Sequence, residues 1–516
     1  MKKRNFLKTL GLVSVFSLFA ISLTSCKEIF DFIVDNIDLG INTYNPDDFA
    51  KTVQENGNYS KFSYQDLNET NVYPITPARG NVNILVVPVE WSDLTAYSNN
   101  NIAAIKAAFN GSKEDDTNNY WESVKSFYYK SSNGLLNFNF EVADKYVPTY
   151  SSDRFVNDAD DYGTESKDLL DDIYKKGLKI NGEKVNFADS KWDSNKDGYI
   201  DGIWMIYNEK DASRVNSDRF WAYVTNYSGD NLTSKFGKYG NCALSFLYSD
   251  SLNGLDAHTL IHETGHMLGL DDYYDYNSSK NKFGYTGGLD MMDLNIGEHN
   301  AFTKHALGWA KAVAVSEANT YTLKPFEESY DSLIIPSSSY NGSAFSEYLL
   351  IEYYTPTGLF KLDSKSNYSN AYPKFFTDKG LRIWHIDARL AYQTYKSNNT
   401  FTWGSYVSNS ISKIPEPVST STTLTEATIA HTNSIDDKTR NKDGHPLIEI
   451  VSRTKNRLYN NRYATNSDLF KKGDVINSSN ISQVLDSGKF YDGSNFSAKL
   501  TVDDITDEAA TLTIEF

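Results

Sequence analysis

The sequence predicts an α+β protein in which a mixed body of helices and strands precedes a β-rich region. Between residues 79 and 314, apolar β-branched runs alternate with segments of helical periodicity. Beyond residue 315, strand patterns replace this alternation. The chain has 516 residues, of which 40% are hydrophobic and 14% aromatic, so it can bury large cores, and its length suggests two or three domains.

The mixed body opens with the run from Val82 to Val89, whose apolar and β-branched side chains suit a buried strand. Helical and strand patterns then alternate along the chain, which favours an α+β or mixed α/β domain. Strands are expected over 82–90, 135–147, 200–208 and 242–248, and helices over 101–109, 115–130, 164–176, 256–268 and 300–313.

The region 315–516 contains β-rich runs at 347–354, 381–387 and 511–516, the last with clean alternation, and we expect a β-sandwich-like fold. His385, inside the second run, is expected to be structural. The boundary with the mixed body could also lie nearer residue 395. The stretch 415–446, crowded with Ser, Thr, Asn and Asp, is expected to be a long mobile loop.

The first 25 residues have the features of a secretory signal peptide. Basic residues at positions 2, 3, 4 and 8 precede an apolar stretch, 10–23, that is short for a membrane span. It ends in Leu23-Thr24-Ser25-Cys26, which resembles the bacterial lipobox, where the Cys is diacylated and becomes the first mature residue. We therefore expect a lipid anchor at Cys26 on the outer side of the bacterial cell membrane, with 26–78 as a tether or short pro-region. The alternative is an ordinary signal peptide with an incidental Cys.

The net charge limits the classes of binding partner, and the cysteine content limits how the fold can be stabilised. The net charge of −17 becomes four units more negative once residues 1–25 are removed, which argues against nucleic acid or anionic lipid surfaces. Only Cys242 remains besides the lipidated residue, so disulfides do not stabilise the chain, and metal ions are the natural substitute. We expect a monomer.

The most specific signal is the run HETGHMLGLDD at residues 262–272. Residues four apart lie on one face of a helix, so His262 and His266 can present nitrogens to one zinc ion. Glu263 is offset by one position, where it can act as general base toward a water activated by the metal. Gly269 can adopt the left-handed conformation that ends helices, and the chain then turns back to bring Asp272 to the metal as third ligand.

Neighbouring residues leave alternatives open. The helix could be an amphipathic core helix whose histidines are simply hydrogen bonded. His258, one turn further away, is expected to support or pack, and Asp271 to cap or support. Glu298 is an alternative third ligand in a gluzincin-like arrangement.

A second metal signal spans residues 193–201. Oxygen-bearing side chains at positions 1, 3 and 5, a Gly at position 6 and a carboxylate at position 9 match the start of a calcium loop, whereas position 12 is Trp204 rather than Glu. We expect a structural calcium loop that leads into a strand; the alternative is a turn that binds nothing. The candidate ligands are Asp193, Asn195, Asp197, Tyr199 and Asp201.

The zinc motif and its surroundings resemble the immune inhibitor A type metallopeptidases of family M6, in which an Asp replaces the third His of the longer metzincin motif. Residues 287–293 look like the methionine turn beneath the metal, with Met292 the better match. Residues 300–309 are similar to the helix that closes the family's catalytic domain, and 126–134 to the segment before an early strand. The resemblance covers about residues 79–390 and implies a zincin-like, metzincin-type catalytic domain over 79–314.

These features imply a lipid-anchored zinc endopeptidase that hydrolyses extracellular proteins, with Glu263 as general base. Three protein ligands leave the open position typical of catalytic zinc sites. Tyr274, His299 and Tyr285 are candidate stabilisers of the transition state. Two alternatives remain: a catalytically inactive adhesin or binding lipoprotein on a protease fold, and a zinc hydrolase that acts on another class of substrate.

Overall fold

The computed structural model describes most of the chain after residue 55. The described residues are 56–69, 74–111, 122–157, 164–210, 218–227, 236–248, 254–277, 284–367, 372–396, 400–459, 462–482, 484–485 and 487–516. The expected signal peptide and Cys26 lie outside these ranges. Within them, no helix combines the length and apolar character needed to cross a membrane.

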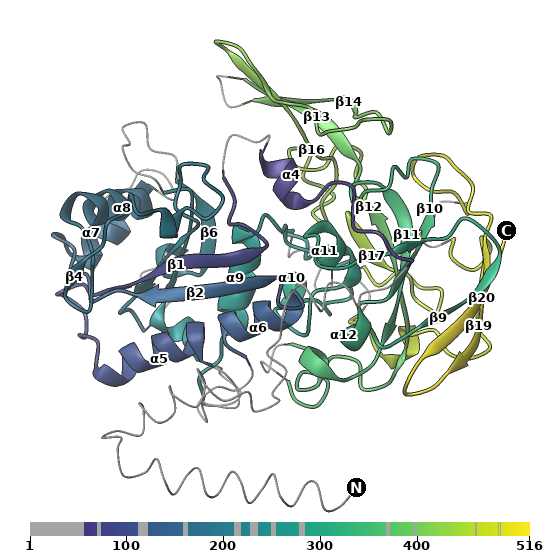
Figure 1. The fold of residues 1–516 in the computed structure, drawn as a ribbon, viewed down its shortest axis with the longest axis horizontal. Coiled ribbons are helices and arrows are strands. Elements are labelled where there is room, and N and C mark those ends of the chain that lie inside the picture. Colours follow the sequence, from purple (N-terminus) through teal and green to yellow (C-terminus); the bar gives the residue numbers. More distant parts are fainter. Residues whose placement is uncertain are drawn as a thin grey trace, which may run out of the picture. The chain divides into compact units, whose positions relative to one another are not determined.

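The mixed body is built on a five-stranded sheet with the order β2-β1-β5-β7-β6. Strands β1, β2 and β6 of this sheet are labelled in Figure 1. The first four strands are parallel, whereas the edge strand β6 runs antiparallel to β7. Between β2 and β5 the chain also forms a small hairpin, β3 and β4. The strands span Gly80–Val89 (β1), Leu136–Val142 (β2), Lys179–Ile180 (β3), Glu183–Lys184 (β4), Ile203–Tyr207 (β5), Tyr223–Asn226 (β6) and Lys238–Ala243 (β7).

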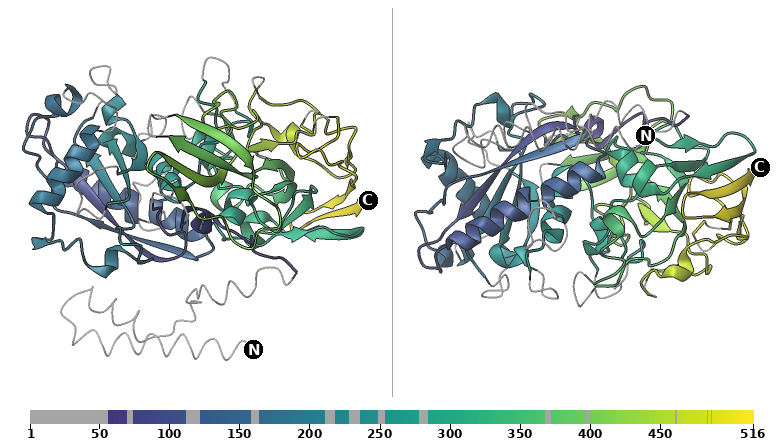
Figure 2. Two further views of the ribbon diagram at one scale, coloured as in Figure 1. Left: turned by 90° about the horizontal axis from the view of Figure 1, so that it is seen from above. Right: turned by 60° about the horizontal axis from the view of Figure 1, so that its bottom comes forward.

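Alternate side chains of β1 enter two cores on opposite faces of this sheet. The ribbon views show helices on both of these faces (Figures 1 and 2). Val82 and Ile84 pack with side chains of α5, α6 and α9, whereas Leu85 and Val87 pack with those of α7 and α8. Helices therefore cover both faces, which explains why β1 and β5 are almost wholly apolar. The helices span Asn99–Asn110 (α5), Val124–Ser131 (α6), Ser152–Asn157 (α7), Thr164–Lys176 (α8) and His258–Met267 (α9), after the short α4, Tyr64–Glu69.

Most expected elements of the mixed body are confirmed. The helices expected over 101–109, 164–176 and 256–268 are α5, α8 and α9, and the first three expected strands are β1, β2 and β5. The helix expected over 115–130 is present from Val124 onward, and residues 112–121 are outside the described ranges.

Two expected elements are wrong in part. The strand expected over 242–248 ends at Ala243, and a 3-10 helix, Leu244–Leu247, follows. The helix expected over 300–313 is α11, Ala301–Ala306, which stops because Gly308 adopts a left-handed φ of 74° and Trp309 bonds back to the Lys304 carbonyl (2.7 Å). The antiparallel edge strand β6 was not expected.

The described residues of the β-rich region form three further sheets, with the orders β17-β12-β11-β10-β8, β14-β13-β16-β15 and β18-β19-β20-β9. The first and third contribute side chains to one shared hydrophobic cluster, among them Ile351 and Ile383 from one sheet and Leu500 and Leu512 from the other, as expected for face-to-face packing. The strands span Val313–Ala314 (β8), Asn319–Leu323 (β9), Ser332–Pro336 (β10), Glu347–Tyr354 (β11), Gly380–Asp387 (β12), Leu390–Lys396 (β13), Phe401–Tyr406 (β14), Val418–Ser419 (β15), Thr423–Ile429 (β16), Ile448–Ile450 (β17), Val475–Ile476 (β18), Lys499–Ile505 (β19) and Ala510–Glu515 (β20).

The expectation of a long loop over 415–446 is wrong. Strands β15 and β16 lie within it, and β16 pairs along its whole length with β13. Its remaining part, residues 430–446, packs inward, since the side chains of Thr432 and Asn433 are buried. Mixed helices and several sheets agree with the expected α+β class, and residues Phe49–Phe516 form one compact unit.

Candidate metal centre

Helix α9 places His262 and His266 one turn apart on the same face of the helix. One side of the helix is buried against the sheet core through Leu260 and Ile261, so the two histidines share the adjacent face. The helix stops after Met267, and Gly269 takes the left-handed conformation (φ 91°) that the sequence predicted. The chain then reverses, and Asp272 returns toward the helix.

The three predicted zinc ligands converge. Nε2 of His262 lies 3.0 Å from Oδ1 of Asp272, and Nε2 of His266 lies 3.2 Å from the same oxygen. One ligand atom from each residue lies within 4.8 Å of those of the other two. Donors about 2.0–2.1 Å from a tetrahedral zinc are roughly 3.3 Å apart, so the spacing fits this ion.

The other ring nitrogens fix the orientation of both imidazoles. Nδ1 of His262 donates to the Met291 carbonyl (2.7 Å), and Nδ1 of His266 donates to the Leu270 carbonyl (2.8 Å). With the proton of the neutral imidazole on Nδ1, the Nε2 atoms are left free to ligate an ion at the common point; without an ion, a protonated Nε2 hydrogen bonds to Asp272 Oδ1 instead. Backbone carbonyls in this supporting position are typical of histidines that ligate zinc.

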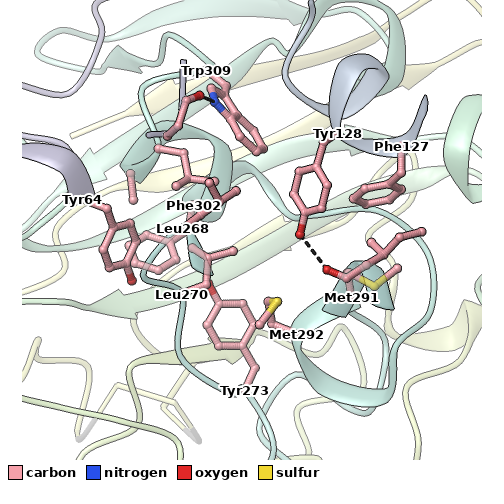
Figure 3. Packing of buried hydrophobic residues seen from close by; sticks show 14 of the residues in the cluster. Tyr64, Phe127, Tyr128, Leu268, Leu270, Tyr273, Met291, Met292, Phe302 and Trp309 are labelled. Carbon is pink, nitrogen blue, oxygen red and sulfur yellow. Dashed lines mark hydrogen bonds between the residues drawn. The ribbon is translucent and has the colours of Figure 1, made fainter. Parts of the chain in front are cut away.

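Met292 lies in the buried core beside Tyr273 (Figure 3) and packs against α9, and its role in a methionine turn stays a prediction. A Cβ built on Gly265 would be only 2.6 Å from Sδ of Met292, so the helix approaches the turn closely because residue 265 has no side chain. The Met292 carbonyl accepts a hydrogen bond from Tyr273 N (2.7 Å). The turn therefore contacts the helix and the Asp272 loop together.

Tyrosines surround the third ligand. The Tyr276 hydroxyl donates to Oδ2 of Asp272 (2.5 Å), which leaves Oδ1 for the histidines. The ring of Tyr274 stacks near that of His262, with centroids 6.3 Å apart and an interplanar angle of 22°. Burial alone would raise the pKa of Asp272, but His266 and the hydrogen bond with His262 hold it well below its usual range. The carboxylate is thus ionised, as a metal ligand must be.

Glu263 follows His262 on the same helix and is half-buried. Its pKa is raised by burial, against the lowering effect of His266 and His262. A carboxylate in such surroundings is more basic than one in water, which suits a group that must take up a proton.

The three candidate stabilisers of the transition state differ in how they lie relative to the zinc ligands. His299 is fully buried against the rings of Phe127, Tyr128 and Trp309, so it does not face solvent. Tyr285 is buried against Tyr459, with ring centroids 4.3 Å apart. Of the three candidate stabilisers, Tyr274 is therefore the one beside the ligands.

The structure gives the contacts of three further residues whose roles the sequence left open: Glu298, His258 and Asp271. Glu298 pairs with Lys304 (3.0 Å) and accepts from Ser131 (2.6 Å), and it does not belong to the converging group. His258 lies between Asp256 (2.6 Å) and Asp363 (3.2 Å) and supports the start of α9. Asp271 forms an ion pair with Arg440.

The loop at 193–201 folds around its own acidic side chains. Asp193 accepts from the backbone amides of Asp197 (3.0 Å) and Gly198 (3.1 Å), and Asp201 accepts from Ser194 N (3.1 Å). Burial, with the nearby charges of Asp193 and Asp197, raises the pKa of Asp201 to about 7. This accumulation of negative charge fits a cation, and calcium binding stays a prediction. Asn195 and Tyr199 are exposed on the same turn.

Sequence reasoning missed the contribution of residues 430–446. Asn433 Nδ2 donates to the Tyr273 carbonyl (2.7 Å), Tyr276 N donates to Ser434 Oγ (3.0 Å), and Arg440 pairs with Asp271. These contacts tie the Asp272 loop to the 430–446 segment. A cavity of about 330 Å³ adjoins this region through Gly269 and Asp271, but its lining includes none of the three ligands.

No protein-family model matches the chain, and no curated protein matches it significantly either.

Proposed function

We propose that the chain is a zinc-dependent endopeptidase. The observation that carries this proposal is the convergence of His262, His266 and Asp272, with Glu263 at the next position of the same helix. Three protein donors are the number that catalytic zinc sites use, because the fourth position serves water or substrate. The finer description of residues 79–314 as a zincin-like, metzincin-type domain belongs to the same proposal and is supported by Met292 beneath Gly265.

When bound, zinc would lower the pKa of a water molecule and polarise the scissile carbonyl. Glu263 accepts the proton from the attacking water and delivers it to the leaving amine. Tyr274, stacked beside His262, is the side chain best placed to donate a hydrogen bond to the developing oxyanion.

The sheet edge offers a place for an extended peptide. Strand β6 is the terminal strand of the sheet and α9 lies against it, so the ligands and the edge belong to one region of the molecule. An extended chain can add to such an edge through backbone hydrogen bonds, which bind protein substrates with little dependence on their side chains. We propose that a lipid at Cys26 holds this activity at the cell surface.

The test is cleavage of an unfolded generic protein by the purified chain. We expect activity that a zinc chelator removes and added Zn²⁺ restores, and that Glu263→Gln lowers by about 10² to 10⁴-fold while zinc stays bound. Glu183→Gln, at an exposed position in β4, is the matched control and should retain full activity. A chain that binds zinc but leaves proteins intact would support the adhesin alternative, and cleavage of a non-peptide substrate alone would support the other hydrolase class.

A further inference from the structure

A second group of two histidines and an aspartate converges far from the first in sequence. Asp387 ends β12, His431 follows β16, and His445 precedes β17. Oδ2 of Asp387 lies 3.2 Å from Nδ1 of His431 and 3.3 Å from Nδ1 of His445, and the three ligand atoms lie within 4.8 Å of one another. These separations match those of the first group and the roughly 3.3 Å expected between donors of a tetrahedral zinc.

We propose that Asp387, His431 and His445 bind a second divalent transition-metal ion, Zn²⁺. Two imidazoles and one carboxylate are donors that zinc accepts, whereas calcium and magnesium prefer all-oxygen sites. Asp387 and His431 are fully buried, and His445 is mostly buried. The site is thus largely covered by protein, with His445 at its accessible side.

The hydrogen bonds around His431 indicate where its protons lie. The Tyr406 hydroxyl donates to Oδ2 of Asp443, because a carboxylate can only accept. The contact between Tyr406 Oη and Nε2 of His431 (3.0 Å) must therefore use a proton on Nε2. Nδ1 of a neutral His431 then carries a lone pair.

That lone pair faces two further acceptors. Nδ1 of His431 lies 3.1 Å from the Asp387 carbonyl oxygen and 3.2 Å from Asp387 Oδ2. Acceptors in contact repel one another unless a cation or a proton lies between them. A bound metal ion accounts for the arrangement, and a doubly protonated His431 is the competing explanation. The chain from Asp443 through Tyr406 to His431 has the form of the supporting contacts found around zinc ligands.

Nearby charges permit an additional cation. Arg389 binds both oxygens of Asp387 (2.7 Å each), which fixes the carboxylate. Glu347 lies 3.7 Å from Arg389 and offsets its charge, and Asp443 contributes a further negative charge. The ring of His445 is held parallel to that of Tyr491, with centroids 3.8 Å apart.

A metal ion at the proposed second site would help to hold the Asp272 loop of the first site in place. His431 and His445 flank the segment whose Asn433, Ser434 and Arg440 contact the Asp272 loop. A metal ion shared by both histidines and Asp387 closes this segment onto β12. Its loss should therefore loosen the support of Asp272 as well.

The experiment is zinc analysis of the intact chain by mass spectrometry after chelation, reloading and desalting. We expect about two zinc ions per chain, one after His431→Ala/His445→Ala, and one after His262→Ala/His266→Ala. Asp436→Asn, at an exposed position on the same segment, is the control and should keep both ions. An unchanged zinc content in His431→Ala/His445→Ala overturns the proposal.

The two sites are separable in the same measurement. If the chain binds one zinc ion and only His262→Ala/His266→Ala loses it, the peptidase proposal stands and the second site is excluded. If only His431→Ala/His445→Ala loses it, the second site stands and the first is excluded. Where the His431→Ala/His445→Ala chain fails to fold, Co²⁺ is added to His262→Ala/His266→Ala. Tetrahedral cobalt absorption supports the second site. Its absence, with ring ¹⁵N shifts of a doubly protonated His431, overturns it.

Discussion

The contact between Gly265 and Met292 supports a quantitative prediction about Gly265→Ala. In an exposed helix this change would stabilise the chain by about 1 kcal/mol, because alanine has the higher helix propensity. Here the new Cβ would lie 2.6 Å from Met292 Sδ and 3.1 Å from its Cε. Both residues are buried, and overpacking of this kind costs about 1–3 kcal/mol. We expect a net destabilisation of about 0–2 kcal/mol.

The effect on zinc binding should be larger than the effect on stability. The obstructing Sδ and Cε end a flexible side chain, so the turn that carries Met291 is displaced only to the extent that Met292 has no room to repack in the buried core. The Met291 carbonyl orients His262, so displacement of the turn would disturb this ligand. Loss of such a supporting contact weakens zinc binding by about 10- to 100-fold. Urea unfolding of the metal-free chain and titration against a chelator of known affinity measure the two quantities separately.

A double-mutant cycle identifies the cause. Met292→Ala alone should cost about 2–5 kcal/mol through the cavity it leaves. In that background the obstacle is gone, so Gly265→Ala should become stabilising by about 1 kcal/mol. The resulting interaction energy is about 1–3 kcal/mol. A Gly265→Ala chain that is fully stabilised with Met292 still present, and that binds zinc normally, would refute the close packing.

Four further predictions concern the site, its support and the location of the protein. Tyr276→Phe removes the donor to Asp272 and should weaken zinc binding by about 10- to 100-fold in the chelator titration, whereas Tyr248→Phe, equally exposed (43% against 45%), should not. Burial alone would lower the pKa of His258, but Asp256 and Asp363 raise it to about 10. The stability that the protonated His258 contributes is therefore complete below about pH 6.5 and is lost as the pH rises toward 10. The free energy of unfolding should fall across this pH range, and should fall less in His258→Gln. Calcium should raise the melting temperature, magnesium less so, and Asp197→Asn should reduce the calcium effect if the 193–201 loop is its site. Cys26→Ser should move the protein from the membrane fraction to the soluble fraction, and unchanged fractionation would exclude the lipid anchor.

The parts of the site that could be predicted are those encoded over a short stretch. A four-residue spacing places His262 and His266 on one helical face whatever the rest of the fold, and Gly269 ends the helix for a local steric reason. Met292 was predicted only through resemblance. Nothing in a lone methionine distinguishes a residue beneath a metal from one that fills a core.

The parts that could not be predicted depend on contacts between distant segments. Asn433, Ser434 and Arg440 lie in a polar stretch whose composition is typical of a loop, and no local pattern shows that it packs against residues 271–276. The same holds for Asp387, His431 and His445, which have no spacing motif because they come from three separate segments. A metal site that is built from one helix and its turn can be recognised from sequence, whereas a site that joins strand ends requires the fold.

This difference bears on how Asp272 is held. The helix constrains the two histidines through its own backbone hydrogen bonds, but Asp272 follows a reversal of the chain and has no such regular support. Its position depends on Tyr276 at its outer oxygen and on the 430–446 segment behind its loop. Substitutions that remove these contacts should therefore weaken zinc binding at the first site without touching any of its ligands. Asn433→Ala, which removes the donor to the Tyr273 carbonyl, is the sharpest case, because a normal zinc affinity in that variant would mean that the Asp272 loop is positioned by α9 and the Met292 turn alone.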